Sequence, residues 1–178
     1  QHLHRSDKPS VITPVLTNRL QEPIPVIQAP LLRSGMIDPI SFFPSGHTDP
    51  TLYPFLGVGL YERALFQRLR GFDEQVEGEY WQQLDFGLRS WLYGYPILNY
   101  GGLACTFPSR QFIIEDRSVK EGMKRVQTKA LGFRQMNGKN YPKRPGRYAD
   151  AHVFADVKKR LALYKTDFLQ LIDQWKAP

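Results

Sequence analysis

Residues 71–94 constrain the fold of this chain more than any other segment, because an acidic turn there leads directly into an amphipathic helix. The turn begins with Gly-Phe-Asp-Glu, and no Lys or Arg occurs in residues 71–88. Apolar residues then recur at spacings of three and four, as on one face of a helix: Trp81, Leu84, Leu88, Trp91 and Leu92. Gly94 stands where such a helix would end. The pattern predicts a half-buried helix whose start carries carboxylates into a cleft.

The same segment carries motifs that are typical of a known enzyme family. It has GFDE at residues 71–74 and QQLDFGLR at residues 82–89, and it ends near Gly94. GVGL at residues 57–60 precedes these motifs, and Trp81 stands directly ahead of the second one. In these residues the chain resembles family 2-type glycosyltransferases of the GT-A fold. The position of Trp81 also resembles the motif region of polypeptide GalNAc-transferases.

Two features of that family are missing from the chain. The family's Glu-Asp pair, of which one carboxylate usually serves as the catalytic base, is replaced by Gln82 and Gln83. The Asp-x-Asp motif that binds metal and nucleotide is absent, because no two aspartates are separated by a single residue. The resemblance therefore implies the C-terminal, acceptor-side half of a GT-A-like domain without its nucleotide-binding half. It implies no cofactor or metal within this chain, and Mn²⁺ or Mg²⁺ only in a full-length protein.

The matched motifs and the two residues Glu79 and Trp81 just ahead of the second one supply the candidate site. We expect Asp85 and Glu79 to be the catalytic carboxylates, because a glutamine cannot remove the proton of an acceptor hydroxyl. Aromatic rings stack on sugars, and amides form hydrogen bonds with sugar hydroxyls. The residues expected to bind substrate are Gly57, Gly59, Trp81, Gln82, Gln83 and Arg89.

Structural roles are open alternatives for several of these residues. Asp85 and Arg89 are four residues apart, which is the spacing of an ion pair within a helix. Glu79 can instead complement the dipole at the helix N-terminus. Gly57 and Gly59 interrupt a strand expected at residues 52–61, where they allow either close approach of a ligand or a bulge.

Positive charge is concentrated in one part of the chain, which has a formal net charge of +7 over 178 residues. Residues 117–147 contain ten Lys or Arg and one Glu, a local balance of +9, so the remainder carries −2. A helix is expected for residues 117–130 and a basic loop, rich in Gly and Pro, for residues 131–147. That loop is either a solvated surface or a flexible clamp for the diphosphate of a nucleotide-sugar. Nucleic acid is not expected as a partner, because the segment lacks a repeated aromatic platform for stacked bases.

The whole pattern predicts an α/β fold in which helices flank a mixed sheet. Residues 1–148 would form the acceptor-side half of a GT-A-like domain. A long amphipathic helix is expected over residues 149–178, packed on that domain or used for dimerisation or for a membrane surface. Its apolar stripe consists of Val157, Leu161, Tyr164, Phe168, Leu171, Ile172 and Trp175.

The predicted function is inverting transfer of a sugar from a nucleotide-sugar donor to a glycan, lipid or protein acceptor, by a chain lacking its nucleotide-binding half. The alternative is a non-catalytic glycan-binding or scaffolding domain derived from a glycosyltransferase. A single cysteine favours the cytoplasm, with peripheral membrane attachment as an option. A sheet edge left uncovered by the missing half would favour a homo-oligomer.

Overall fold

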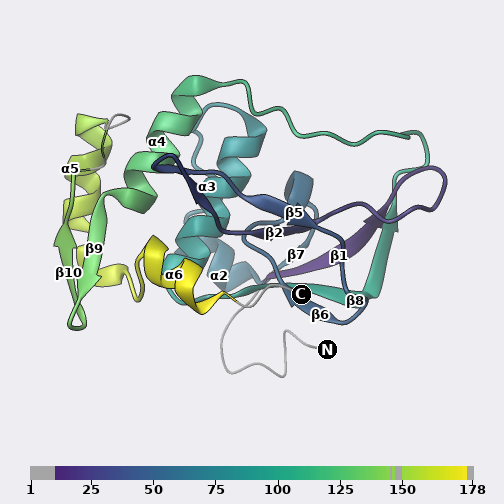
Figure 1. Ribbon diagram of the computed structural model, residues 1–178, viewed down its shortest axis with the longest axis horizontal. Coiled ribbons are helices and arrows are strands. Elements are labelled where there is room, and N and C mark those ends of the chain that lie inside the picture. The colour runs from purple at the N-terminus through teal and green to yellow at the C-terminus, as the bar shows by residue number, and fades with distance from the viewer. Residues whose placement is uncertain (1–10, 145, 147–149, 176–178) are drawn as a thin grey trace.

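The computed structural model describes residues 11–144, 146 and 150–175 (Figure 1). The strands are β1 (Val11–Thr17), β2 (Ile27–Ala29), β3 (Leu32–Arg33), β4 (Met36–Ile37), β5 (Ile40–Phe42), β6 (Thr48–Pro50), β7 (Leu60–Tyr61), β8 (Ile97–Thr106), β9 (Phe133–Met136) and β10 (Lys139–Pro142). The helices are α2 (Arg63–Arg68), α3 (Glu79–Leu92), α4 (Lys120–Leu131), α5 (Ala151–Lys159) and α6 (Phe168–Gln174), with short 3₁₀ helices η1 (Phe55–Gly57) and η2 (Leu161–Leu163). None of the described helices is long and apolar enough to cross a membrane.

The main sheet is mixed, as the sequence predicts. Its strand order is β6-β8-β1-β7, in which β1 runs parallel to β8 while β6 and β7 pair antiparallel with their neighbours. The register of β1 against β8 shifts after Pro14, a residue that cannot donate to the ladder. The buried amide of Asn99 donates a hydrogen bond to the carbonyl oxygen of Pro14 at 2.7 Å and so supports this irregular part of the sheet. The α/β class is therefore confirmed.

Helix α3 lies at the centre of the molecule, and eleven of its fourteen residues are buried. Leu84 enters the main core, which α4, α5 and α6 also build, whereas Phe86 packs into a second cluster beside α2 and β8. The helix ends as predicted, because Gly94 has a φ of 85° and its N–H donates to the carbonyl oxygen of Trp91. The predicted helix is confirmed, but it is covered on nearly every side rather than half-buried because clusters form on two of its faces.

Close packing against α3 depends on Gly87. A β-carbon at this position would lie 2.2 Å from the carbonyl oxygen of Leu52 and 2.5 Å from Cβ of Tyr53. Glycine therefore allows the segment before η1 to pass directly across the helix backbone. The strand predicted for residues 52–61 is wrong for this reason: most of the segment is irregular or forms η1, and only Leu60–Tyr61 pair with β1.

The described C-terminal segment is not one long helix, which corrects the prediction for residues 149–178. It forms α5, η2 and α6 in succession. Asp167 begins α6 with a capping box, in which its carboxylate accepts the N–H of Gln170 while the Gln170 side chain accepts the N–H of Asp167. The same carboxylate accepts a hydrogen bond from the N–H of Gln135 on β9 at 2.8 Å, so a tertiary contact stabilises the interruption between α5 and α6. Four residues of the predicted stripe are nevertheless buried: Val157, Tyr164, Phe168 and Leu171.

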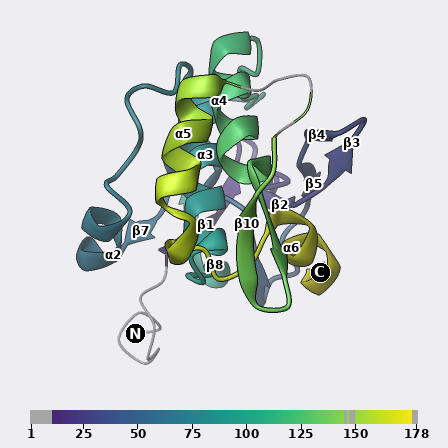
Figure 2. The same ribbon diagram turned by 90° about the vertical axis from the view of Figure 1, so that its left-hand side faces the viewer.

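The basic segment is also more regular than predicted. β9 and β10 form an antiparallel hairpin beside α5 (Figure 2), instead of a loop over residues 131–147. Asn137 and Gly138 connect the strands with φ values of 49° and 73°. Positive φ at both positions is the geometry that an Asn-Gly turn favours. The Asn-Gly pair is thus a local hairpin signal, which the Gly and Pro content of the segment obscured.

Candidate functional site

The first turn of α3 borders a small pocket. The helix begins after Gly78, which has a φ of 87° and provides no side-chain cap. Glu79, Tyr80 and Gln83 line one wall of the pocket, and η1 and residues 110–119 contribute the other walls. Its volume is about 280 Å³, which is near the lower end of the range for small-molecule sites.

Gln83 stands where the resemblance implies a catalytic carboxylate. It is 8% exposed, and its amide lies against Gly57, where a β-carbon would be 3.7 Å from Nε2 of Gln83. Its Oε1 is buried and accepts no hydrogen bond from the described residues. A buried oxygen without a donor costs about 1–3 kcal/mol. The Gln83 side chain lines the pocket, so a ligand whose donor reached this oxygen would remove that cost.

Glu115 reaches the same pocket from the loop that follows β8. Its Oε2 accepts a hydrogen bond from the hydroxyl of Tyr53 at 2.7 Å, and its Oε1 accepts one from the N–H of Leu56 at 3.4 Å. Arg117 lies 3.8 Å from Oε2, and the Glu115 side chain is only 3% exposed. Burial raises the pKa of Glu115 above its ordinary value, although these three partners lower it. The pocket thus contains a fixed carboxylate with increased proton affinity.

Aromatic contacts hold the partners of this carboxylate. Tyr80 meets Tyr53 edge-on with 5.8 Å between ring centroids, and the guanidinium of Arg117 lies 4.6 Å from the centroid of the Tyr80 ring. Burial raises the pKa of both tyrosines, so their hydroxyls stay neutral at physiological pH. The sequence provided no signal for Glu115, because 62 positions separate it from Tyr53 and no motif includes it.

Several predicted site residues point away from this pocket. Gly59 packs on β1, where a β-carbon would lie 3.1 Å from the carbonyl oxygen of Ile12. Trp81 is 6% exposed and belongs to the main core. Gln82 donates a hydrogen bond to the carbonyl oxygen of Val76 at 2.9 Å and so supports the preceding turn. The predicted residues that do meet beside the pocket are Gly57, Glu79 and Gln83.

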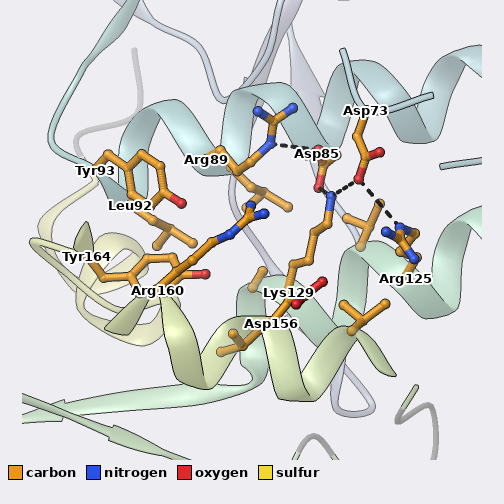
Figure 3. A pocket seen from close by; sticks show the side chains of 15 residues that line it. Asp73, Asp85, Arg89, Leu92, Tyr93, Arg125, Lys129, Asp156, Arg160 and Tyr164 are labelled. Atoms are coloured by element: carbon orange, nitrogen blue, oxygen red, sulfur yellow. Dashed lines mark hydrogen bonds and ion pairs between the residues drawn. The ribbon is translucent and has the colours of Figure 1, made fainter. Parts of the chain in front are cut away.

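Asp85 lies elsewhere, in a cavity between α3, α4 and α5 (Figure 3). Its Oδ2 accepts a hydrogen bond from Nε of Arg89 at 2.7 Å, and its Oδ1 accepts one from Nζ of Lys129 at 2.8 Å. The side chain of Asp85 is 1% exposed. The pair that the spacing of Asp85 and Arg89 predicts is therefore present. This is the geometry of a structural ion pair, while catalysis by Asp85 stays a prediction.

The two cations extend this network to the GFDE turn. Arg89 donates hydrogen bonds to the backbone carbonyl oxygens of Leu69 and Gly71, and Lys129 also binds Asp73 (Figure 3). Burial by itself would raise the pKa of Asp73, but the hydrogen bond and the positive charge of Lys129 outweigh it and lower the pKa to about 2. The network thereby connects the turn to α3 and α4 and holds the start of α3 in position.

Acid is expected to weaken this network. Because the pKa of Asp73 is lower in the folded chain, its ionised carboxylate adds to the free energy of unfolding at pH values above the ordinary carboxyl pKa of about 4. This contribution is lost as the pH falls toward about 2. Urea unfolding at pH 5, 4 and 3 should show the free energy of unfolding falling across this window. In Asp73→Asn the free energy of unfolding should fall less steeply with decreasing pH. An equally steep fall in that variant would contradict the assignment of this pH dependence to Asp73.

The basic residues that the structure describes in the 117–147 segment do not form a single clamp. Arg117 lies near the pocket, while Arg125 and Lys129 pair with Asp73. The hairpin β9–β10 lies beside α5, well away from residues 108–114 (Figure 1). The described cations are therefore spread over several separate places, and Arg117 is the one whose ion pair with Glu115 adjoins the pocket.

The geometry defines a mixed α/β domain with a small pocket lined by carboxylates, an amide and apolar side chains. Within the described residues, no group of three or more His, Cys, Asp or Glu side chains is arranged to hold a metal ion. No protein-family model matches the chain, and no curated protein is significantly similar to it.

Proposed function

We propose that this chain is the acceptor-side half of a GT-A-type glycosyltransferase, and that the pocket at the start of α3 binds the acceptor sugar. The observation that carries the proposal is Gln83. Its amide occupies the motif position, lines the pocket and has a buried Oε1 without a donor among the described residues. A sugar hydroxyl can donate to this oxygen and at the same time accept a hydrogen bond from another group.

The other lining residues support the same ligand class. Glu79 and Glu115 offer carboxylate oxygens to hydroxyl groups, and Leu56 and Val119 offer apolar surface to the C–H groups of a sugar ring. Arg110 also lines the pocket, and its charge would stabilise a departing diphosphate. A nucleotide-binding half, in a longer protein, would supply the donor site and its Mn²⁺ or Mg²⁺.

Gln83 also favours a second function, a glycan-binding domain without catalysis, because a glutamine cannot take a proton. Release of nucleoside diphosphate separates the two functions. A full-length protein that releases it from UDP-sugars or GDP-sugars is a transferase. A protein that binds glycans and releases none is a binding domain.

Replacing Gln83 with Leu should weaken glycan binding by about 5- to 150-fold, because a buried hydrogen bond of roughly 1–3 kcal/mol is lost. Binding of a panel of mono- and disaccharides would be measured by saturation-transfer NMR on the chain itself. The melting temperature should stay the same or rise, because the unpaired oxygen disappears with the amide.

Gln67→Leu is the matched control. Gln67 is an exposed residue of α2 outside the pocket, so this variant removes the same amide without touching the site. It should bind as the unmodified chain does. Equal binding by both variants would contradict the proposed acceptor site.

A further inference from the structure

Inverting transfer needs a base that removes the proton of the acceptor hydroxyl, and the motif position cannot supply one. Gln83 stands there, and an amide is not basic at neutral pH. Asp85 is the acid that remains in the motif, but it lies between Arg89 and Lys129 and outside the pocket lining. The base must therefore be another residue that lines the pocket.

Three carboxylates line the pocket, and their surroundings differ. Glu79 and Asp116 are exposed, and hydrogen bonds from Ser118 lower the pKa of Asp116, which makes it a weaker base. The side chain of Glu115 is only 3% exposed. A buried carboxylate is a stronger base, because water stabilises its charge less. Among these three groups, Glu115 has the surroundings of a general base.

The hydrogen bonds of Glu115 position it and leave room for a substrate. Tyr53 occupies one site on Oε2, and the N–H of Leu56 makes a long contact of 3.4 Å with Oε1. An ionised carboxylate can accept about four hydrogen bonds, so an acceptor hydroxyl can still bind. Arg117, at 3.8 Å, favours the ionised form that a base requires.

We propose that Glu115 is the general base of sugar transfer, in place of the motif carboxylate that Gln83 replaces; this inference rests on the proposed function. Glu115 removes the hydroxyl proton while the acceptor oxygen forms its bond to the anomeric carbon of the nucleotide-sugar. The bond from that carbon to the diphosphate oxygen breaks, and the nucleoside diphosphate leaves with the electron pair. The proton stays on Glu115 until solvent removes it. Gln83 orients the acceptor by accepting a hydrogen bond from a second hydroxyl.

Glu115→Gln tests this role in the full-length protein. Release of nucleoside diphosphate from UDP-glucose, UDP-N-acetylglucosamine and GDP-mannose would be measured with disaccharide acceptors. Turnover should fall by about 10²–10⁴-fold, while the isolated chain should still bind the acceptor. Glu121→Gln is the control, because Glu121 is an exposed residue of α4 outside the pocket. It should leave turnover unchanged.

The melting temperature separates a lost base from a damaged fold. The pKa of Glu115 is higher in the folded chain than in the unfolded chain, so the folded chain favours the protonated carboxyl. The contribution of Glu115 to the free energy of unfolding is therefore complete below its pKa in the unfolded chain and is lost as the pH rises through its pKa in the folded chain. At pH 7 the neutral glutamine of Glu115→Gln should therefore preserve or raise the melting temperature. Tyr53→Phe gives an independent measurement: it removes a hydrogen bond that lowers the pKa of Glu115, so the acid limb of the rate profile should move to higher pH.

The outcomes distinguish failure of the base assignment from failure of the transferase proposal. Full turnover by Glu115→Gln overturns the base assignment and leaves the transferase proposal in place. No turnover by the unmodified protein with any of the three donors overturns both. If Glu115→Gln does not fold, the rate profile of Tyr53→Phe decides, and an unmoved acid limb overturns the assignment.

Discussion

Replacing Asp85 with Asn is expected to lower the free energy of unfolding by about 3–5 kcal/mol, the typical effect of removing one partner of a buried ion pair. The side chains of Arg89 and Lys129 are 9% and 15% exposed, and both would lose the carboxylate that they share. For a domain of this size the melting temperature should fall by about 6–20 °C. Differential scanning calorimetry would measure both quantities.

Glu121→Gln provides the comparison, because it breaks an exposed pair with Lys124 within α4. Such a pair contributes at most about 1 kcal/mol, so this variant should melt almost as the unmodified chain does. An equally small effect of Asp85→Asn would contradict the structural role. If turnover were then lost at an unchanged melting temperature, the catalytic role that the motif predicts for Asp85 would be supported.

Replacing Gly87 with Ala should destabilise the chain by about 3 kcal/mol, near the upper end for an overpacked core. The new methyl group would lie 2.2 Å from the carbonyl oxygen of Leu52 and 2.5 Å from Cβ of Tyr53. Backbone atoms cannot rotate away as a side chain can, so α3 and residues 52–53 would have to separate. Urea unfolding monitored by circular dichroism would measure the loss.

Gly146→Ala is the control for this prediction. A β-carbon at Gly146 has no heavy atom within 4 Å, so the same methyl group is added in open space. Its effect should lie within about 0.5 kcal/mol, as for most surface substitutions. A stable Gly87→Ala protein would show that residues 52–53 can move away from α3, and Tyr53 would then not be a fixed partner for Glu115.

Asp85 and Glu115 illustrate how surroundings assign different roles to two buried carboxylates. Asp85 has a fixed cation on each oxygen and lies outside the lining of the pocket. Glu115 has one neutral hydroxyl donor, one long backbone contact and one arginine at 3.8 Å. We therefore expect neutralisation to destabilise the fold at Asp85 and to affect only chemistry at Glu115.

Local sequence was sufficient for α3 and its end. The apolar spacing from Trp81 to Leu92 and the glycine at position 94 act over a few residues, and both predictions hold. The Asp85–Arg89 pair follows from the helical spacing in the same way. The spacing could not show that the pair is buried. Burial raises the expected cost of breaking it from roughly tenths of a kcal/mol to roughly several kcal/mol.

Tertiary contacts decided the elements that the sequence mispredicted. The apolar stripe after residue 150 has helical spacing throughout, yet Asp167 binds Gln135 on the hairpin and begins a new helix there. Residues 52–61 are apolar enough for a strand, but Gly87 brings them across a helix instead of into the sheet. In both places a contact between distant residues outweighs a local preference.

The candidate site shows the same division. Sequence alone placed Gly57 and Gln83 together through their motif positions and Glu79 just ahead of the second motif, and the structure brings these three beside one pocket. It could not separate Gln83 from Gln82 or Trp81, because helical neighbours face different directions and only packing selects the side that borders a cavity. Glu115 depended on tertiary structure entirely, since its partner Tyr53 is 62 residues away and chain folding alone brings the two side chains within 2.7 Å.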